Sequence, residues 1–75
     1  MNAWVRFINK TSYNIVYLKT DERQLPLLLI KDIPSRFTLC PAGSAELILY
    51  DSKGSPLKSS VVSIRPAKLQ TIAVY

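Results

Sequence analysis

Apolar and polar side chains alternate along most of this chain, with the period of two that is typical of half-buried β-strands. Segments of this kind, rich in β-branched and aromatic residues, cover residues 4–8, 14–18, 36–40, 45–50, 57–64 and 69–75. No segment shows apolar spacing at i, i+3, i+4 and i+7 over three helical turns. The pattern therefore predicts an all-β protein of six or seven short strands, spaced as in a small antiparallel β-sandwich or a barrel.

The apolar run LPLLLI at residues 25–30 could be a short helix or an extended segment. Pro26 and Pro34 leave only residues 27–33 between them, which is too short for a stable helix. We therefore predict an extended edge segment or a short strand. Residues 19–24 are charged or polar throughout and have no apolar side chain to bury, so we predict an exposed loop there.

Proline and glycine mark the turns between the strands. In residues 37–49, FTLCPAGSAELIL, an apolar run ends at Pro41 and an alternating segment starts again after Gly43, which predicts two strands joined by a Pro-Ala-Gly turn. Gly54 lies in residues 51–56, DSKGSP, whose composition is typical of a hairpin loop. Pro66 lacks the N–H that a central strand needs, so we place it in the connection before the last strand.

The 75 residues are enough for one domain, spanning residues 1–75. A chain of this size buries only about 60% of the surface that its unfolded form exposes, so we expect marginal stability. Small folds are usually reinforced by disulfides, a metal or a partner subunit. One cysteine, Cys40, and no histidine exclude an internal disulfide and a Cys/His zinc site. The remaining ways to stabilise so small a fold are oligomerisation and unusually tight packing.

The sequence offers little catalytic chemistry. Without histidine, the usual base for a serine or cysteine nucleophile is missing, and neither a phosphate-binding loop nor a nucleotide-binding glycine motif is present. We predict a protein that is not an enzyme, with no catalytic residue, no cofactor and no metal site. Cys40 is expected in the core, with an intermolecular disulfide as the alternative. The longest apolar run, residues 27–30, is too short to span a membrane, and the N-terminus lacks the pattern of a secretory signal.

Ten lysines and arginines against five acidic residues give a net charge of +5, which could favour nucleic acid, anionic lipid or an acidic protein. The basic residues never form a run, and dispersed charges are more typical of a solvated face or of edge-strand protection. The seven aromatic residues could stack on nucleobases or sugar rings, although cross-strand packing is the simpler interpretation. A carbohydrate-binding module would require at least two aromatic side chains exposed on one face.

Several apolar, strand-prone segments would invite pairing with another chain if they lay at a sheet edge, above all residues 25–30, 61–62 and 72–75. Trp4 and Tyr75 are expected to be exposed because both lie near the chain ends. We predict a homo-oligomer that assembles by strand addition or sheet stacking. The candidate interaction surface comprises Trp4, Leu25, Leu27, Leu29 and Tyr75.

Four stretches follow one another in an order that resembles a bacterial family of small immunoglobulin-like or transthyretin-like β-sandwiches, catalogued as a domain of unknown function. They are VRFIN (5–9), NIVYL (14–18), FTLCPAGSAELILYD (37–51) and LKSSVVSIRPAKLQTIAVY (57–75). Two places depart from the family pattern: residues 10–13 replace a His-Ala-Ser-Pro-Asp-like stretch, and Ala67-Lys68 replaces a glycine in the last turn. The resemblance implies no enzyme and no cofactor, and members are commonly secreted or surface-anchored.

Together, the residues and the resemblance predict a non-enzymatic structural or interaction module of a bacterial surface assembly, such as a spore coat, a cell envelope or a filament. Its partner would be a second copy or another surface-assembly protein. Two alternatives stay open: a small basic β-barrel that binds single-stranded nucleic acid, and a carbohydrate-binding module.

Overall fold

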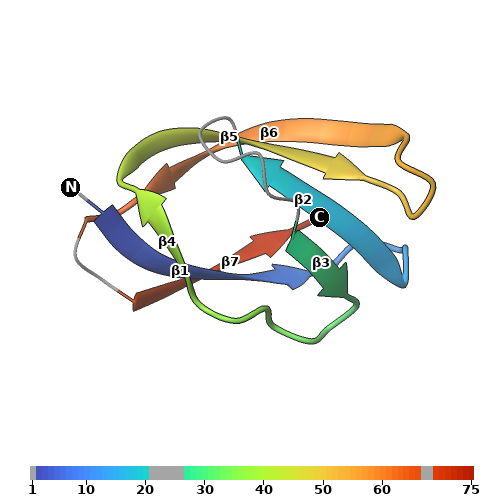
Figure 1. Ribbon diagram of the computed structural model, residues 1–75, viewed down its shortest axis with the longest axis horizontal. Helices are drawn as coiled ribbons and strands as arrows, with labels where there is room; N and C mark the ends of the chain where they lie inside the picture. Colours follow the sequence, from blue (N-terminus) through green and yellow to red (C-terminus); the bar gives the residue numbers. More distant parts are fainter. Residues whose placement is uncertain (1, 21–26, 67–68) are drawn as a thin grey trace.

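The computed structural model describes residues 2–20, 27–66 and 69–75, which form seven β-strands in two packed sheets (Figure 1). The prediction of a small all-β sandwich is confirmed. The described ranges contain no helix. The strands are β1 (Asn2–Asn9), β2 (Ile15–Thr20), β3 (Leu27–Ile30), β4 (Thr38–Pro41), β5 (Gly43–Tyr50), β6 (Pro56–Ile64) and β7 (Leu69–Val74).

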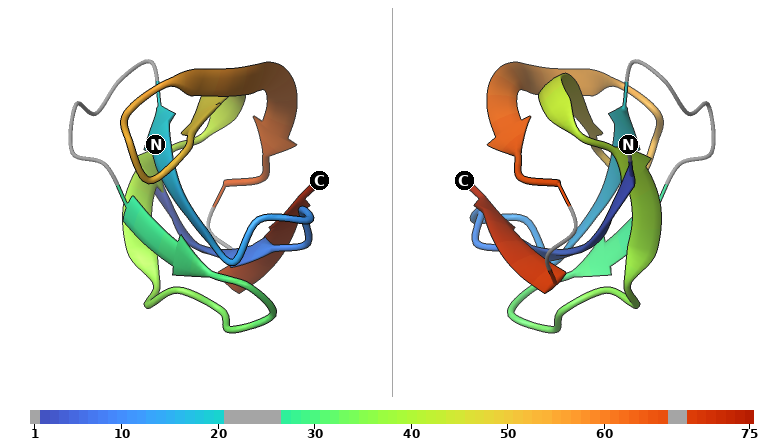
Figure 2. Two further views of the ribbon diagram at one scale, coloured as in Figure 1. Left: turned by 90° about the vertical axis from the view of Figure 1, so that its right-hand side faces the viewer. Right: turned by 90° about the vertical axis from the view of Figure 1, so that its left-hand side faces the viewer.

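One sheet has three strands in the order β4-β1-β7, and the other has four in the order β3-β2-β5-β6. Four of the five pairings are antiparallel, as predicted. The fifth joins β1 and β7 in parallel, so the first and last strands of the chain lie side by side. Figure 2 shows the edge strands β6 and β7 on one side of the sandwich and β3 and β4 on the other.

The alternation along β1 sets the inner and outer faces of the three-stranded sheet. Val5 and Phe7 are completely buried, whereas Trp4, the residue before Val5, points to the other face and is half exposed. The four-stranded sheet contributes the facing half of the core. The buried apolar residues are Ala3, Val5, Phe7, Val16, Leu18, Leu29, Cys40, Ala45, Leu47, Leu49, Ile64 and Val74.

Asn9 is the one polar residue in the described chain that is fully buried. Its Nδ2 donates to the carbonyl oxygens of Tyr13, at 3.0 Å, and of Leu29, at 3.5 Å. Its Oδ1 accepts from the backbone N–H of Thr11, at 2.9 Å, and from the Thr11 hydroxyl, at 2.6 Å. The side chain thus fixes the turn between β1 and β2 and ties it to β3.

The Pro-Ala-Gly segment leads the chain from one sheet to the other. Pro41 ends β4, which pairs with β1, and Gly43 begins β5, which pairs with β2 and β6. The prediction of two strands here is confirmed, and the structure adds that they belong to different sheets. A single residue, Ala42, separates the two strands, so the chain bends from one layer to the other within a very short distance.

Gly43 makes this bend possible through its backbone conformation. Its φ is +115°, and a Cβ built on it would meet nothing within 4 Å. An alanine would therefore fit the space but not the dihedral angle. We expect Gly43→Ala to lower the free energy of unfolding by about 1–2 kcal/mol in urea titrations. Ser44→Ala, next to it and exposed, should change stability by less than about 0.5 kcal/mol; equal losses in both variants would contradict this explanation.

The other two predicted turns lie where the sequence placed them. Gly54, with φ +87°, belongs to the β5–β6 hairpin, where the Asp51 carboxylate accepts from the backbone N–H groups of Lys53 and Ser55 at 2.9 and 2.8 Å. Pro66 lies between β6 and β7. The Gln70 side chain closes this connection by bonding both to the N–H of Arg65, at 3.1 Å, and to its carbonyl, at 2.7 Å.

Candidate interaction surfaces

The structure supports only part of the predicted interaction surface. Trp4 and Tyr75 are exposed, with 50% and 70% of their surface accessible. Leu27 is half-buried against the core. Leu29 is a correction: it pairs with the buried Val16 and is only 1% exposed, so its side chain cannot belong to a surface. Leu25 lies outside the described residues.

Three of the four sheet edges carry features that hinder pairing with another chain. β3 and β4 are only four residues long, and β4 ends in a proline. Before β4 begins, Ser35 already contacts β1, since its N–H donates to the carbonyl of Phe7 at 2.7 Å. β6 begins with Pro56 and carries Lys58 in register with the buried Leu49. Its pairing with β5 also has a bulge beside this lysine, and a proline, a charge and a bulge on an edge strand all oppose the addition of a further strand.

The fourth edge, β7, has none of these features. It runs for six residues, LQTIAV, without a charge, a proline or a bulge. The backbone N–H of Lys10 donates to the carbonyl of Val74 at 2.8 Å, so the main-chain groups of Val74 face β1. Because successive residues of a strand point their main-chain groups to opposite sides, Leu69, Thr71 and Ala73 present theirs to the open edge.

The outer face of the three-stranded sheet carries a row of apolar side chains. Trp4 on β1 is in register with Leu39 on β4 and Leu69 on β7, so all three project from the same face. Their exposed fractions are 50%, 36% and 71%. Phe37, just before β4, is also exposed. We call these four residues with Arg6 the Trp4 face.

Arg6 is held in a fixed position on the Trp4 face. Its Nε donates to the Thr71 hydroxyl on β7 at 2.8 Å, and its guanidinium lies over the Phe37 ring, 5.0 Å from the ring centre. A guanidinium has five N–H donors, of which this hydrogen bond uses one. Its terminal nitrogens therefore remain available beside the exposed indole of Trp4.

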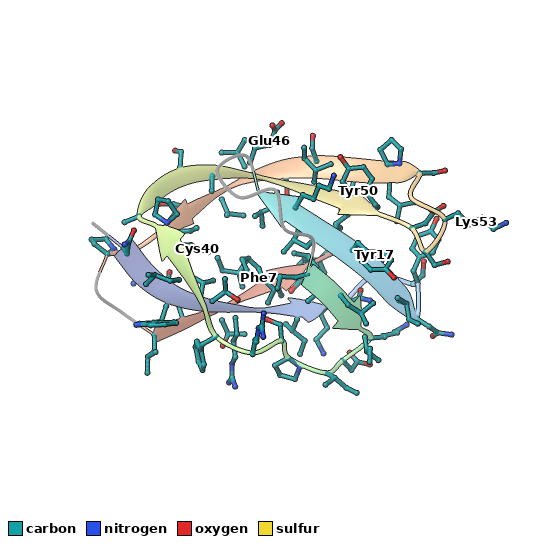
Figure 3. All side chains as sticks on the ribbon, viewed as in Figure 1. Phe7, Tyr17, Cys40, Glu46, Tyr50 and Lys53 are labelled. Atoms are coloured by element: carbon teal, nitrogen blue, oxygen red, sulfur yellow. The ribbon has the colours of Figure 1, made fainter. Side chains whose placement is uncertain are left out.

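The outer face of the four-stranded sheet is also partly apolar, but its arrangement differs. Tyr17 is in register with Leu28 and Tyr50, and the Lys19 ammonium lies 5.1 Å from the centre of the Tyr50 ring. Glu46 lies further along β5 on this face and points away from the molecule (Figure 3). Here the aromatic side chains are half-buried and serve cross-strand packing, as predicted for most of the aromatics.

The described carboxylates all lie away from the Trp4 face. Asp32 forms an ion pair with Lys10 at 2.9 Å, and the hydrogen bond and charge of that ammonium hold the pKa of the Asp32 carboxyl below its usual value. Asp51 is engaged in the β5–β6 hairpin, and Glu46 is on the other sheet. The Trp4 face therefore has positive charge that no neighbouring carboxylate of the described chain neutralises.

Cys40 is 3% exposed within the core, which confirms its predicted position and leaves its sulfur inaccessible to another chain. Across residues 2–20, 27–66 and 69–75, no three His, Cys, Asp or Glu side chains gather where they could hold a metal ion. The same ranges contain no helix that could span a membrane.

No protein-family model matches the chain, and neither the curated proteins nor the solved structures compared with it gave a match. The fold and the surfaces described above define a small seven-stranded β-sandwich with one unprotected edge and one exposed aromatic face. The resemblance to the family of small bacterial sandwiches stays a prediction.

The sequence predicts that residues 72–75 would pair with another chain if they lay at a sheet edge, but that β7 is an edge strand follows only from its parallel pairing with β1. The contact of Arg6 with Thr71 was not predicted. Arg6 and Thr71 are 65 residues apart, and nothing in either local sequence indicates their contact. The available signal was the alternation in residues 4–8, which places Trp4 and Arg6 on one face of a strand.

Proposed function

We propose that this chain is a non-enzymatic structural or interaction module that associates through strand addition at the open edge of β7. The observation that carries the proposal is the contrast between β7 and the other three edges. Among the described edge strands, β7 alone is longer than four residues and also lacks both a charged residue and a proline. Incoming strands bind such edges through main-chain hydrogen bonds, with little demand on their sequence.

The partner that we propose for this edge is a second copy of the chain. Each protomer carries a net charge of +5, which opposes association in general. Two β7 edges would nevertheless meet without placing like charges opposite each other, since residues 69–75 are uncharged. A twofold antiparallel pairing would join the two three-stranded sheets into one sheet of six strands. Oligomerisation would also add the stability that the small core lacks.

Membership of a bacterial surface assembly, such as a spore coat, an envelope layer or a filament, rests on the sequence resemblance alone. Association at the β7 edge does not depend on it. The two parts of the proposal can therefore be tested separately, the first by locating the protein in cells and the second with purified protein.

Light scattering after size exclusion tests the edge directly. We expect the mass of the wild type to rise above the 8.5 kDa of the monomer between micromolar and millimolar concentration. Ala73→Pro removes an N–H that points to the open edge and should keep the protein monomeric, because proline is tolerated at an edge position but cannot donate to an incoming strand. Ala73→Ser, the matched control, keeps that N–H and should associate like the wild type.

Circular dichroism would show whether Ala73→Pro retains the fold, and only a folded variant is compared. A wild type that stays monomeric over the whole concentration range would refute self-association. Association of folded Ala73→Pro at wild-type strength would exclude β7 as the edge that is used.

A further inference from the structure

We infer that the Trp4 face, on the outside of the three-stranded sheet, binds single-stranded nucleic acid, with a base stacked on Trp4 and a phosphate bound by Arg6. This site uses side chains on the face of the sheet, whereas strand addition would use the main-chain groups of the β7 edge, so it does not depend on self-association. Three features of the face support it: the exposed aromatic side chains, the fixed guanidinium and the distribution of charge.

The aromatic side chains provide a stacking surface. Trp4 lies on β1, the central strand, between Leu39 and Leu69, and half of its surface is accessible. Phe37 is exposed on the same face, on the β4 side. Bases stack on such aromatic side chains with little dependence on sequence. Trp4 thus offers an exposed ring for a base, and the Phe37 ring, with the Arg6 guanidinium over it, adds a second aromatic side chain on the same face.

The guanidinium of Arg6 supplies the phosphate contact. Trp4 and Arg6 are two residues apart on one strand, which separates their Cα atoms by about 7 Å on the same face. The hydrogen bond to Thr71 and the Phe37 ring hold Arg6 in place before a ligand arrives. Its terminal nitrogens can bind two phosphate oxygens at once, in the geometry that makes arginine common at phosphate sites.

Positive charge lies next to the aromatic rings of this face. Arg6 is at its centre, and the exposed Arg36 comes directly before Phe37. Arg65 does not belong to the face: Gln70, which bonds to its backbone, is in register with a buried residue of β1 and so points to the inner side of β7. Arg6 and Arg36 therefore supply the positive charge beside the rings.

An acidic polysaccharide could also offer anions and rings. Nucleic acid fits better because its planar bases match both aromatic side chains, and because each nucleotide brings its own phosphate to a face that combines rings with arginines. The Arg6 guanidinium can bind a carboxylate of such a polysaccharide in the same two-pronged geometry as a phosphate, so the planar bases are what favours nucleic acid. An acidic polysaccharide is therefore the competing outcome that the experiment must separate.

Trp4 is the only tryptophan in the chain, so its fluorescence reports the site directly. We expect an oligothymidine of about 12 nucleotides, within the usual range of site sizes, to quench this fluorescence saturably at low salt. With Arg6 and Arg36 engaged, log K should fall against log salt with a slope of about −1.4. Arg6→Gln should weaken binding and reduce the slope by about 0.7, the value for one phosphate on a single strand.

Anisotropy of a labelled oligothymidine extends the test to the tryptophan itself. Trp4→Ala should bind about 5- to 100-fold more weakly, whereas Trp4→Phe, which keeps a ring, should recover part of the loss. Lys53→Gln is the matched control for charge: Lys53 lies at the tip of the β5–β6 hairpin, away from the Trp4 face (Figure 3). Its affinity should stay within about twofold of the wild type at moderate salt.

Three results would overturn the inference. The first is no quenching by oligothymidine at low salt. The second is an equal loss of affinity in Arg6→Gln and Lys53→Gln, which would indicate attraction by net charge alone. The third is quenching of Trp4 by polygalacturonate at lower concentration than by oligothymidine, which would identify an acidic polysaccharide as the ligand. Each measurement can be repeated on Ala73→Pro, which should stay monomeric, so that nucleic-acid binding is measured independently of edge association.

Discussion

Replacing Asn9 by aspartate is expected to cost about 3–5 kcal/mol of folding free energy at pH 7, most of the stability that a chain of this size has. The two side chains have nearly the same shape, so packing is preserved. The change replaces the Nδ2 donor with an oxygen that would face the carbonyl oxygens of Tyr13 and Leu29. Since Asn9 is fully buried, no water can take the place of the lost donor.

The loss in Asn9→Asp should depend on pH, and the sign follows from burial. A carboxylate that is desolvated and faces carbonyl oxygens has a pKa above its unfolded value of about 3.9. The folded state then binds more protons than the unfolded state, so the variant is most stable below that value and loses stability as the pH rises. Urea titrations at pH 7 and at about pH 4 should therefore show partial recovery at the lower pH.

Asn14→Asp is the control for this measurement because Asn14 is exposed, just before β2. Its stability should stay within about 0.5 kcal/mol of the wild type. A loss in Asn9→Asp that is the same at both pH values would contradict the argument, since it would mean that the new carboxyl group does not titrate differently in the folded state.

The period-two pattern predicted most of the strands because each strand has one buried and one exposed face. In residues 4–8 the alternation of Trp4 and Arg6 with Val5 and Phe7 gave the right faces. In residues 27–30, LLLI, every position is apolar, so the pattern contained no information about which side faces the core. The structure places Leu29 inside and leaves Leu28 and Ile30 exposed. Leu29 was assigned to the surface because a uniformly apolar run does not show which of its residues face the core.

Pairing between strands was harder to predict than the strands themselves. Turn chemistry at Pro41 and Gly43 correctly indicates a break between two strands, but it does not say whether they pair or separate into two sheets. Adjacent strands usually pair, and here β4 and β5 do not. The parallel contact of β1 with β7 joins segments more than 60 residues apart and depends on how all intervening strands stack. The β7 edge and the Arg6–Thr71 contact depend on that pairing, so both required the structure.

The two proposed activities use different atoms of the same sheet. Strand addition would use the outward main-chain groups of Leu69, Thr71 and Ala73, whereas nucleic acid would use the side chains of Trp4 and Arg6. Thr71 contributes to both, since its hydroxyl positions Arg6 while its backbone faces the open edge. A paired β7 edge would keep the Trp4 face exposed and place two such faces in one continuous sheet. Assembly and binding could therefore occur together, with a longer strand of nucleic acid bound across both protomers.

Phe7→Ala should have an effect of similar size through loss of packing, about 3–5 kcal/mol, enough to unfold a domain of this length. Phe7 is fully buried on β1, and Figure 3 shows it between the two sheets. It lies on the central strand of the smaller sheet, and its side chain is the largest of the fully buried ones in the described residues. Phe7→Leu should retain most of the volume and cost much less, about 1.5 kcal/mol.

Phe37→Ala, the exposed counterpart, should cost less than either variant because its ring lies on the surface against Arg6. Circular dichroism and urea titration give the three values. A core centred elsewhere would reverse the order of Phe7→Ala and Phe37→Ala, and the two sheets would then be held together by contacts other than this ring.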